Sequence, residues 1–384
     1  MTAPLKVFLV AAEESGDRLG AALISALRTR RPDVIFRGLG GAHMAASGVS
    51  SLFPIEDLSI MGFMTIPGKL PAILRRIRET VDAIKAAQPD VLVIIDSPDF
   101  THRVARRVRA AMPTLPIVDY VSPSVWAWRP GRARVMRAYV DHVLALLPFE
   151  PAAHARLGGP PCTYVGHPLV ERAGVLRPGA DDVLRRGSDL PVLVVMPGSR
   201  SGELRRMLPV FGQTVALVAD RVGAIDVVIA AVPHLAERIE GEVRSWRTPV
   251  RLAVTQAERD AAFRAARAAL VKSGTGTLEL AVSAVPMVAS YKASALEAFV
   301  ARRLVKVPTV ILANLVLGEN IVPEFLQEDA DPQRMAEALL PLLADTPERA
   351  RQVEAFKRLD AIMEIGTARP SDRAAEIVLK LAKG

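Results

Sequence analysis

The chain has 384 residues, more than one hydrophobic core usually fills, so we expect two α/β domains. Hydrophobic residues make up 50% of the sequence, but no apolar run is long enough for a membrane-spanning helix. The N-terminus shows neither a long hydrophobic segment nor a cleavage site, which favours a cytoplasmic protein. The single cysteine, Cys162, excludes an internal disulfide framework and a multi-cysteine zinc site.

The formal net charge of +8 comes mainly from arginine, since only nine of the 49 basic residues are lysine. Such a surface attracts nucleic acid, anionic lipid headgroups and phosphorylated substrates alike. Aromatic residues make up only 5% and do not interleave with the basic residues, so we expect no nucleic-acid partner. The six histidines lack the spacing of metal ligands, so we expect no bound transition metal.

Short apolar strands alternate with amphipathic helices along the chain, an order that predicts parallel sheets. In the first half we expect strands 7–11, 34–37, 91–95, 117–120 and 141–147, and helices 19–29, 70–87 and 101–111. In the second half we expect strands 192–196, 226–231, 250–253, 268–271 and 287–290, and helices 205–222, 235–245, 258–266 and 278–283. From Pro332 onward the pattern is helical throughout.

The two series predict an α/β protein with two Rossmann-like, doubly wound parallel-sheet domains. We expect the first domain at 1–170 and the second at 190–345, joined where glycine and proline cluster between 166 and 190. The helices of 346–384 are expected to pack back on the first domain. Ligands of such sheets bind beyond the carboxyl ends of the strands, so we expect the site in a cleft where the domains face each other.

Two glycine-containing loops follow the first expected strands. Residues Glu13 to Asp17, with the sequence EESGD, follow the first strand and would face the cleft. Residues Gly38 to Gly41 follow the second strand, but their spacing makes a poor dinucleotide fingerprint, so we expect no NAD cofactor.

The connection from Leu58 to Pro67 is unusually apolar and contains Ile60, Met61, Phe63 and Met64. Basic residues follow it closely, among them Lys69, Arg75, Arg76 and Arg78. Apolar and basic residues together are typical of a segment that docks on a membrane surface or an acyl chain. A loop buried in the core, followed by a solvated helix face, explains the pattern equally well.

Two carboxylates, Asp96 and Asp99, stand directly after the apolar strand 91–95. An aspartate at a strand end that faces a cleft can take a proton from an attacking hydroxyl, so either could be a general base. The alternative is that an aspartate caps the turn or the next helix, and Asp99 suits that role better than Asp96.

Arg200 ends the sequence PGSR, which follows the strand 192–196 and precedes a helical pattern. The turn lacks the lysine of a P-loop but places a guanidinium where a strand ends, suited to holding a diphosphate. A turn followed by a solvated basic helix would also explain it.

The stretch SGTGTLE, from Ser273 to Glu279, lies between an apolar strand and a helical pattern. Its glycines allow a ligand close to the backbone, and free amides at the start of a helix favour an anion. Glu279, one turn into the helix, can accept hydrogen bonds from sugar hydroxyls. An ordinary turn capped by serine or threonine is the alternative.

With these loops in place, the sequence resembles the lipid-A-disaccharide synthase family nearly end to end. The most specific motif is YVSPSVWAWR, from Tyr120 to Arg129, since nothing general about α/β proteins calls for two tryptophans and an arginine there. The resemblance also rests on EESGD, IDSPDF at 95–100, VGHP at 165–168, PGSR and SGTGTLE. Two departures stand out: Ala12 replaces the usual glycine, and Glu319 stands where the family has an arginine, although Asn314 is retained.

The resemblance implies a GT-B fold and an inverting transfer from UDP-2,3-diacylglucosamine to 2,3-diacylglucosamine 1-phosphate, which gives a β-1,6-linked disaccharide 1-phosphate and UDP. It implies that Asp96 is the base and that Arg200 and the amides of 274–277 stabilise the diphosphate. The implied UDP ligands are Arg200, Ser273, Gly274, Thr275, Gly276, Thr277, Glu279 and Asn314. The implied acceptor and donor contacts are Ser15, Gly16, Asp17, Asp99, Ser122, Trp126 and Arg129.

Acylated substrates also give the apolar stretch a purpose, namely docking on the anionic cytoplasmic face of the inner membrane through Ile60, Met61, Phe63, Met64, Arg75 and Arg76. No metal or other cofactor is implied, and a homodimer stays open. Two rivals remain: a UDP-N-acetylglucosamine 2-epimerase of the same architecture, and a two-lobed sugar-binding protein without enzymatic activity. The epimerase has a soluble substrate, and the binding protein would ordinarily carry a secretion signal.

Overall fold

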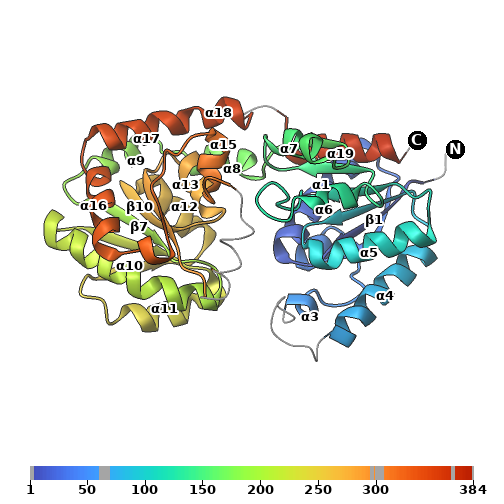
Figure 1. The fold of residues 1–384 in the computed structure, drawn as a ribbon, viewed down its shortest axis with the longest axis horizontal. Helices are drawn as coiled ribbons and strands as arrows, with labels where there is room; N and C mark the ends of the chain where they lie inside the picture. The colour runs from blue at the N-terminus through green and yellow to red at the C-terminus, as the bar shows by residue number, and fades with distance from the viewer. Residues whose placement is uncertain (1–3, 60–69, 295–297, 299–306, 365–367, 383–384) are drawn as a thin grey trace. The chain divides into compact units, whose positions relative to one another are not determined.

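A computed structural model describes residues 4–59, 70–294, 298, 307–364 and 368–382. The contacts divide the chain into two compact units. Unit 1 comprises Met1–Pro168 and Thr367–Gly384, and unit 2 comprises Leu169–Gly366. Each unit contains one six-stranded parallel sheet with helices on both faces, so the expected fold class of two doubly wound sheets is confirmed (Figure 1).

The sheet of unit 1 has the strand order β2-β1-β3-β4-β5-β6. Its strands are β1 (Lys6–Ala11), β2 (Ile35–Leu39), β3 (Val91–Ile95), β4 (Ile117–Tyr120), β5 (His142–Ala145) and β6 (Cys162–Tyr164). Every residue of β3 is buried, with alternate side chains in the cores on the two faces of the sheet. The order reverses between β1 and β3, where Ala11 pairs with Ile95, so the loops after these strands lie side by side.

The two faces of the unit 1 sheet are covered by helices from different parts of the sequence. One face carries α1 (Glu14–Arg30), α2 (Ala42–Ala46) and α19 (Pro370–Leu381), and the other carries α4 (Leu70–Ala87), α5 (Pro98–Ala111) and α6 (Gly131–Met136). The remaining helices are α3 (Glu56–Ser59) and α7 (Glu150–Leu157). The C-terminal helix α19 packs on α1, where Arg30 donates hydrogen bonds to Asp372 at 2.5 Å and Glu376 at 2.9 Å.

The sheet of unit 2 has the order β12-β11-β10-β7-β8-β9 and reverses between β7 and β10. Its strands are β7 (Val192–Met196), β8 (Asp226–Ala230), β9 (Val250–Ala253), β10 (Ala268–Lys272), β11 (Met287–Tyr291) and β12 (Glu324–Leu326). One face is covered by α10 (Ser201–Val222), α11 (Ala236–Val243) and α16 (Pro332–Leu343). The other described α-helices are α8 (Leu169–Leu176), α9 (Ala180–Arg186), α12 (Gln256–Ala265), α13 (Gly276–Val282), α15 (Leu312–Leu317), α17 (Pro347–Lys357) and α18 (Leu359–Ile362). Two short 3₁₀ helices span Pro233–Leu235 and Gln327–Asp329.

The segment between 166 and 190 folds as helices α8 and α9 of unit 2, although its glycines and prolines suggested a linker. The buried Arg186 explains why, because its guanidinium donates to the carbonyls of Phe263, Arg264, Ser283 and Ala284 at 2.7 to 3.0 Å. Burial lowers the pKa of Arg186 to about 10. These bonds connect α9 to α12 and to the end of α13. Glycine and proline therefore end the helices in this segment without making it a linker.

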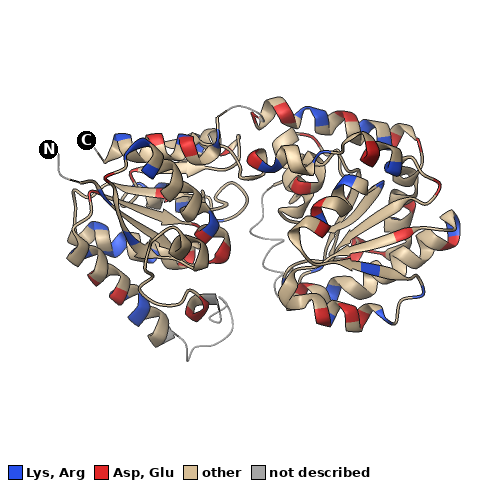
Figure 2. Ribbon diagram, turned by 180° about the vertical axis from the view of Figure 1, so that it is seen from behind, with Lys and Arg blue, Asp and Glu red and all other residues tan. Residues whose placement is uncertain are grey.

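Charged residues of both signs are interspersed over the helices of each unit, while the strands are largely uncharged (Figure 2). This distribution is expected for sheets that are buried on both faces. Helices α17 and α18 belong to unit 2 and α19 to unit 1, so the C-terminal segment divides between the two units.

Candidate active site

Asp96 lies directly after β3, at the switch point of unit 1. The switch point of each unit is the place where its strand order reverses, between β1 and β3 in unit 1 and between β7 and β10 in unit 2. Its carboxylate accepts a hydrogen bond from the Ser15 hydroxyl, which comes from the loop after β1, at 2.8 Å. The backbone amide of Ser97 donates to its other oxygen at 2.7 Å. Among the described residues these are its hydrogen-bond donors, and it has no ion pair. A half-buried carboxylate held by neutral donors keeps lone pairs for an incoming hydroxyl.

The backbone around Asp96 is strained. Asp96 and Ser97 have φ values of 53° and 45°, and Val121, which follows β4, has φ of 90°. Left-handed conformations cost about 1 kcal/mol or more per non-glycine residue, and a β-branched side chain makes the cost higher. The fold holds this strain through the amide of Asp96, which donates to the Tyr120 carbonyl, and the Thr101 hydroxyl, which donates to the Asp96 carbonyl. Strain of this kind is typical of functional sites.

Asp99 has different surroundings from Asp96. It lies in the first turn of α5, and a guanidinium nitrogen of Arg132 lies 3.5 Å from its carboxylate. No side-chain cap begins this helix, so the capping role suggested for Asp99 is not what the structure shows. Arg132 thus contacts one oxygen of Asp99, whereas Asp96 has no ion pair among the described residues, which favours Asp96 over Asp99 as a base.

Gly16 and Asp17 support the loop after β1. A Cβ atom on Gly16 would come within 3.1 Å of the Ile95 carbonyl, so the helix start packs closely on β3. Asp17 is buried, and its carboxylate accepts the amides of Gly41, His43 and Met44 at 2.7 to 3.0 Å. Asp17 therefore joins the first two loops of the sheet and has its oxygens occupied within unit 1.

The motif from Tyr120 to Arg129 is anchored by His154 and Glu150, two side chains that no motif in the sequence singled out. Buried Ser122 contacts Nε2 of His154 at 2.8 Å, and the indole nitrogen of Trp126 donates to Glu150 at 3.1 Å. Burial lowers the pKa of His154 and raises the pKa of Glu150 to about 7. Ser122 and Trp126 thus hold the loop, whereas Arg129 is exposed and stacks over Trp128, with 4.3 Å from its guanidinium carbon to the ring centroid.

Three charged side chains meet at the switch point of unit 2. Glu203, on α10, is 4% exposed and accepts the Ser199 amide at 3.0 Å. Its other oxygen contacts Nζ of Lys272 at 3.0 Å and a guanidinium nitrogen of Arg200 at 3.3 Å. Arg200 itself is 76% exposed, so its donors are available to a ligand. Although burial opposes ionisation, Lys272, the Ser199 amide and Arg200 together lower the pKa of Glu203.

The loop from Ser273 to Gly276 presents backbone amides. Gly274 has φ of 153°, and the amides of Gly274, Thr275 and Gly276 donate no hydrogen bond to the described residues. Ser273 is buried, with its amide on the Ser290 carbonyl, and the Thr277 amide and hydroxyl both bond the Gly274 carbonyl. Ser273 and Thr277 therefore shape the loop, and the amides of 274–276 remain for an anion.

Glu279 points toward Arg172 of α8, with 3.5 Å between the two charged groups. The same guanidinium donates to Asp260 of α12 at 2.5 Å. Burial raises the pKa of Glu279, and Arg172 opposes that effect. The Glu279 carboxylate is still 27% exposed, which leaves an oxygen for a sugar hydroxyl.

Asn314 and Glu319 have structural partners. Asn314 is buried, its oxygen accepts the amides of Ile321 and Val322 at 3.1 and 2.9 Å, and its nitrogen donates to the Val322 carbonyl at 3.0 Å. Its amide therefore holds the turn after α15 instead of reaching out to a ligand. Glu319, in that turn, forms a 2.8 Å ion pair with Arg358, which lowers its pKa.

The basic residues expected at a membrane surface differ from one another. Arg76 is 19% exposed, pairs with Asp57 and Glu79, and stacks over Phe53 at 4.4 Å, so it serves the fold. Arg75 is 65% exposed with a loose 3.5 Å contact to Glu79. Ile60, Met61, Phe63 and Met64 lie outside the described residues.

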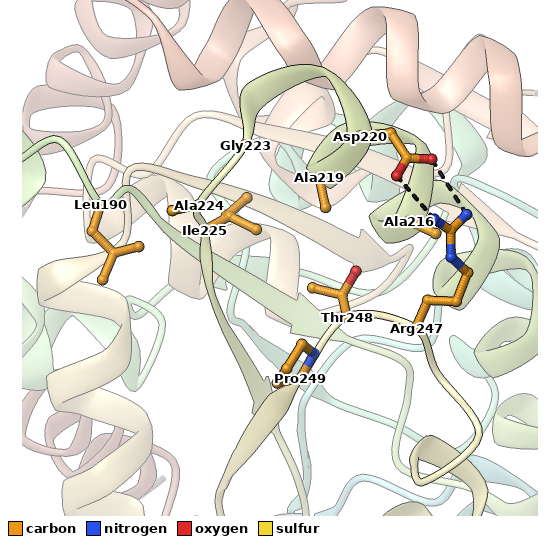
Figure 3. A pocket seen from close by; sticks show the side chains of 10 residues that line it. All are labelled: Leu190, Ala216, Ala219, Asp220, Gly223, Ala224, Ile225, Arg247, Thr248 and Pro249. Atoms are coloured by element: carbon orange, nitrogen blue, oxygen red, sulfur yellow. Dashed lines mark hydrogen bonds and ion pairs between the residues drawn. The ribbon is translucent and has the colours of Figure 1, made fainter.

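Two cavities lie away from these residues. One, of about 360 Å³, is lined by Leu190, Asp220, Ile225, Arg247 and Pro249, near the amino ends of β7, β8 and β9 (Figure 3). The other, of about 210 Å³, lies near the amino ends of β1 and β2. Ligands of doubly wound sheets bind at the opposite edge, so we give neither cavity a role in catalysis. Across the described ranges no group of histidine, cysteine or carboxylate side chains could hold a metal ion.

Comparison with known proteins bears on the whole chain. A family described as lipid-A-disaccharide synthetase matches residues 7–378. Proteins named lipid-A-disaccharide synthase are 59% identical over 98% of this chain in Nitrobacter hamburgensis, 60% in Nitrobacter winogradskyi and 42% in Rhodospirillum centenum, each covered over 95% of its length. Within the described residues no helix is long and apolar enough to cross a membrane.

Solved structures resemble the chain in fold at low sequence identity. The UDP-GlcNAc 2-epimerase of Neisseria meningitidis, bound to UDP-GlcNAc, superimposes with a TM-score of 0.63 at 12% identity, covering 99% of this chain and all of the other. The calicheamicin glycosyltransferase CalG4 gives a TM-score of 0.58 at 16% identity, covering 100% of this chain and 99% of the other. These similarities establish the GT-B fold that glycosyltransferases and epimerases share.

Proposed function

The chain belongs to the lipid-A-disaccharide synthetase family, and on this premise we propose which residues carry out its reaction. It is a glycosyltransferase of lipid A synthesis, acting on UDP-2,3-diacylglucosamine and 2,3-diacylglucosamine 1-phosphate. The acceptor 6-hydroxyl attacks the anomeric carbon of the donor, and the bond from that carbon to the diphosphate breaks. The products are the β-1,6-linked disaccharide 1-phosphate and UDP, and a single displacement inverts the anomeric carbon.

Asp96 is the general base of this proposal. The observation that carries it is a half-buried carboxylate at the switch point of unit 1, bonded only to neutral donors among the described residues. The acceptor proton moves to Asp96 as the oxygen attacks, and the Ser15 hydroxyl and Ser97 amide orient the carboxylate. The strained backbone at Asp96 and Ser97 supports the assignment.

Groups of unit 2 take the leaving UDP. Arg200 and the amides of Gly274 to Gly276 bind the diphosphate, whose negative charge rises as its bond to the anomeric carbon breaks. Glu279, with Arg172 beside it, accepts hydrogen bonds from the ribose hydroxyls. Ser273, Thr277 and Asn314 act by shaping the loops, because their polar groups are used within unit 2.

The decisive experiment incubates the purified chain with both acylated substrates and measures release of UDP and formation of the disaccharide. Absence of UDP release would remove the proposal. The two rival functions gain nothing from the comparisons, since the epimerases resemble the chain at 12% identity, whereas relatives at 59% are named as the synthase.

We also propose that the chain docks on the cytoplasmic face of an anionic membrane, because its substrates carry acyl chains. The segment with Ile60, Met61, Phe63 and Met64 supplies the apolar part, and Arg75 supplies charge. Replacing those four apolar residues by serine should weaken binding to anionic liposomes while UDP affinity stays unchanged. Unaltered liposome binding would contradict the docking proposal. A homodimer is tested separately by light scattering.

A further inference from the structure

Lys272 is a cation at the switch point of unit 2 that the sequence motifs left unassigned. It ends β10, directly before the loop from Ser273 to Gly276. β10 pairs with β7, whose end leads into the loop that carries Arg200. Its side chain is 17% exposed, so the ammonium is mostly desolvated but still reachable.

Three neighbours hold the ammonium of Lys272 in place. The buried Glu203 carboxylate lies 3.0 Å from Nζ, and the ring centroid of Tyr291, on the adjacent strand β11, lies 5.0 Å away. On a third side is Gly274, where a Cβ atom would come within 3.4 Å of Nζ. The glycine thus leaves room for the ammonium beside the loop whose amides point to no described acceptor.

The charges of this cluster do not cancel. Glu203 carries one negative charge and contacts two cations, Lys272 and Arg200, through the same oxygen. Each cation has donors beyond that one contact, since an ammonium has three and a guanidinium five. Together with the amides of Gly274 to Gly276 they form a positive group of the size that a diphosphate requires.

We propose that Lys272 binds the diphosphate of the UDP-sugar and stabilises the charge of the departing UDP, with Glu203 positioning it beside Arg200. The inference rests on the proposed glycosyl transfer and extends it. As the bond between the anomeric carbon and the diphosphate oxygen breaks, its electron pair stays on that oxygen. Lys272 donates hydrogen bonds to the diphosphate and transfers no proton. The alternative role for Lys272 is to neutralise the Glu203 carboxylate without contacting the diphosphate.

The test measures binding of UDP and of uridine to Lys272→Met by calorimetry. Uridine lacks the diphosphate, so the proposal expects UDP affinity to fall about 10- to 100-fold while uridine affinity is unchanged. Lys272→Arg should recover part of the UDP affinity because it keeps the charge. Arg205→Met is the matched control, since it removes an exposed cation from α10, and it should bind UDP as the wild type does.

Lys272→Met leaves Glu203 buried without its cation, which can destabilise unit 2. The double variant Lys272→Met with Glu203→Gln removes both charges, and its thermal melting shows whether the fold is restored. Its UDP affinity should still be lower than that of the wild type, while its uridine affinity should be unchanged. Equal affinity of the folded variant and the wild type for UDP, or a parallel loss of UDP and uridine, overturns the assignment of Lys272. A wild-type chain that binds neither ligand instead contradicts the proposed function.

Discussion

The switch points of the two units use one topology for opposite charges. In unit 1, the loops after β1 and β3 present Asp96 among neutral donors. In unit 2, Arg200 in the loop after β7 and Lys272 at the end of β10 lie around the buried Glu203. A displacement needs a group that accepts a proton and another that receives negative charge. In both units the parallel sheet fixes where a ligand can bind, and a few side chains at the strand ends decide the charge that it meets.

The largest effect is expected from Asp96→Asn, which removes the carboxylate at the switch point of unit 1. The amide keeps the size of the side chain but cannot take the acceptor proton, so kcat should fall about 10²- to 10⁴-fold. UDP affinity should stay at the wild-type value because the residues proposed to bind the diphosphate lie in unit 2. The measurement is UDP release with saturating acylated substrates, beside equilibrium binding of UDP.

Asp99→Asn is the control for this change, since Asp99 is already paired with Arg132. It should retain most of the activity. Near-normal turnover of Asp96→Asn, together with an inactive Asp99→Asn, would transfer the role of base to Asp99.

Arg200→Met tests the cationic side and should have the next largest effect. Loss of one preorganised donor to a developing anion costs about 10²-fold in kcat/KM, and here UDP affinity should fall as well. Arg200→Lys should recover only part, because an ammonium lacks the paired donors of a guanidinium. If Arg200→Met lowered kcat and left UDP affinity unchanged, the assignment of Arg200 to the diphosphate would be wrong.

Asn314→Ala probes the support under the cationic side. It leaves the amides of Ile321 and Val322 and the Val322 carbonyl without partners, and this should lower the free energy of unfolding by about 3 kcal/mol. Chemical denaturation measures the change, and the exposed Asn320→Ala is the matched control. Loss of UDP affinity with unchanged stability would instead place Asn314 on the ligand.

Glu150 probes the support under the acidic side through pH. Burial, partly offset by the Leu147 amide and the Trp126 indole, raises its pKa from 4.5 to about 7, so the folded chain binds a proton that the unfolded chain releases. Its contribution to stability is therefore full below pH 4.5 and is lost as the pH rises to about 7. The free energy of unfolding of the wild type relative to Glu150→Gln should fall by about 1 to 3 kcal/mol across this range.

An exposed acid provides the comparison for Glu150. Asp82→Asn on α4, with a side chain that is 62% exposed, is measured against the wild type over the same pH range. A flat pH profile for the difference between the wild type and Glu150→Gln would show that Glu150 has a normal pKa.

The sequence predicted the elements well where apolar periodicity was long and unbroken. Strands β3, β7 and β9 have the expected bounds. The expected helix at 205–222 begins earlier, at Ser201, and the apolar pattern missed its first turn because Ser201, Gly202 and Glu203 are not apolar. Short strands such as β6 and β12 escaped prediction, since three residues carry no usable alternation. The units join at Pro168 and Leu169, within the expected range of 166 to 190, but α8 and α9 of this range fold into unit 2, where hydrogen bonds from Arg186 outweigh local propensity.

The two doubly wound sheets, and the positions of Asp96, Arg200 and the SGTG loop after strand ends, could be predicted from the sequence, because hydrophobic period and glycine placement are local properties. Which polar groups contact one another depends on the tertiary structure. Ser15 reaches Asp96 across 81 residues of chain, and Lys272 meets Arg200 at a carboxylate buried on a third element. Such contacts depend on strand order and register, which bring distant loops to one edge of a sheet and which no local pattern encodes.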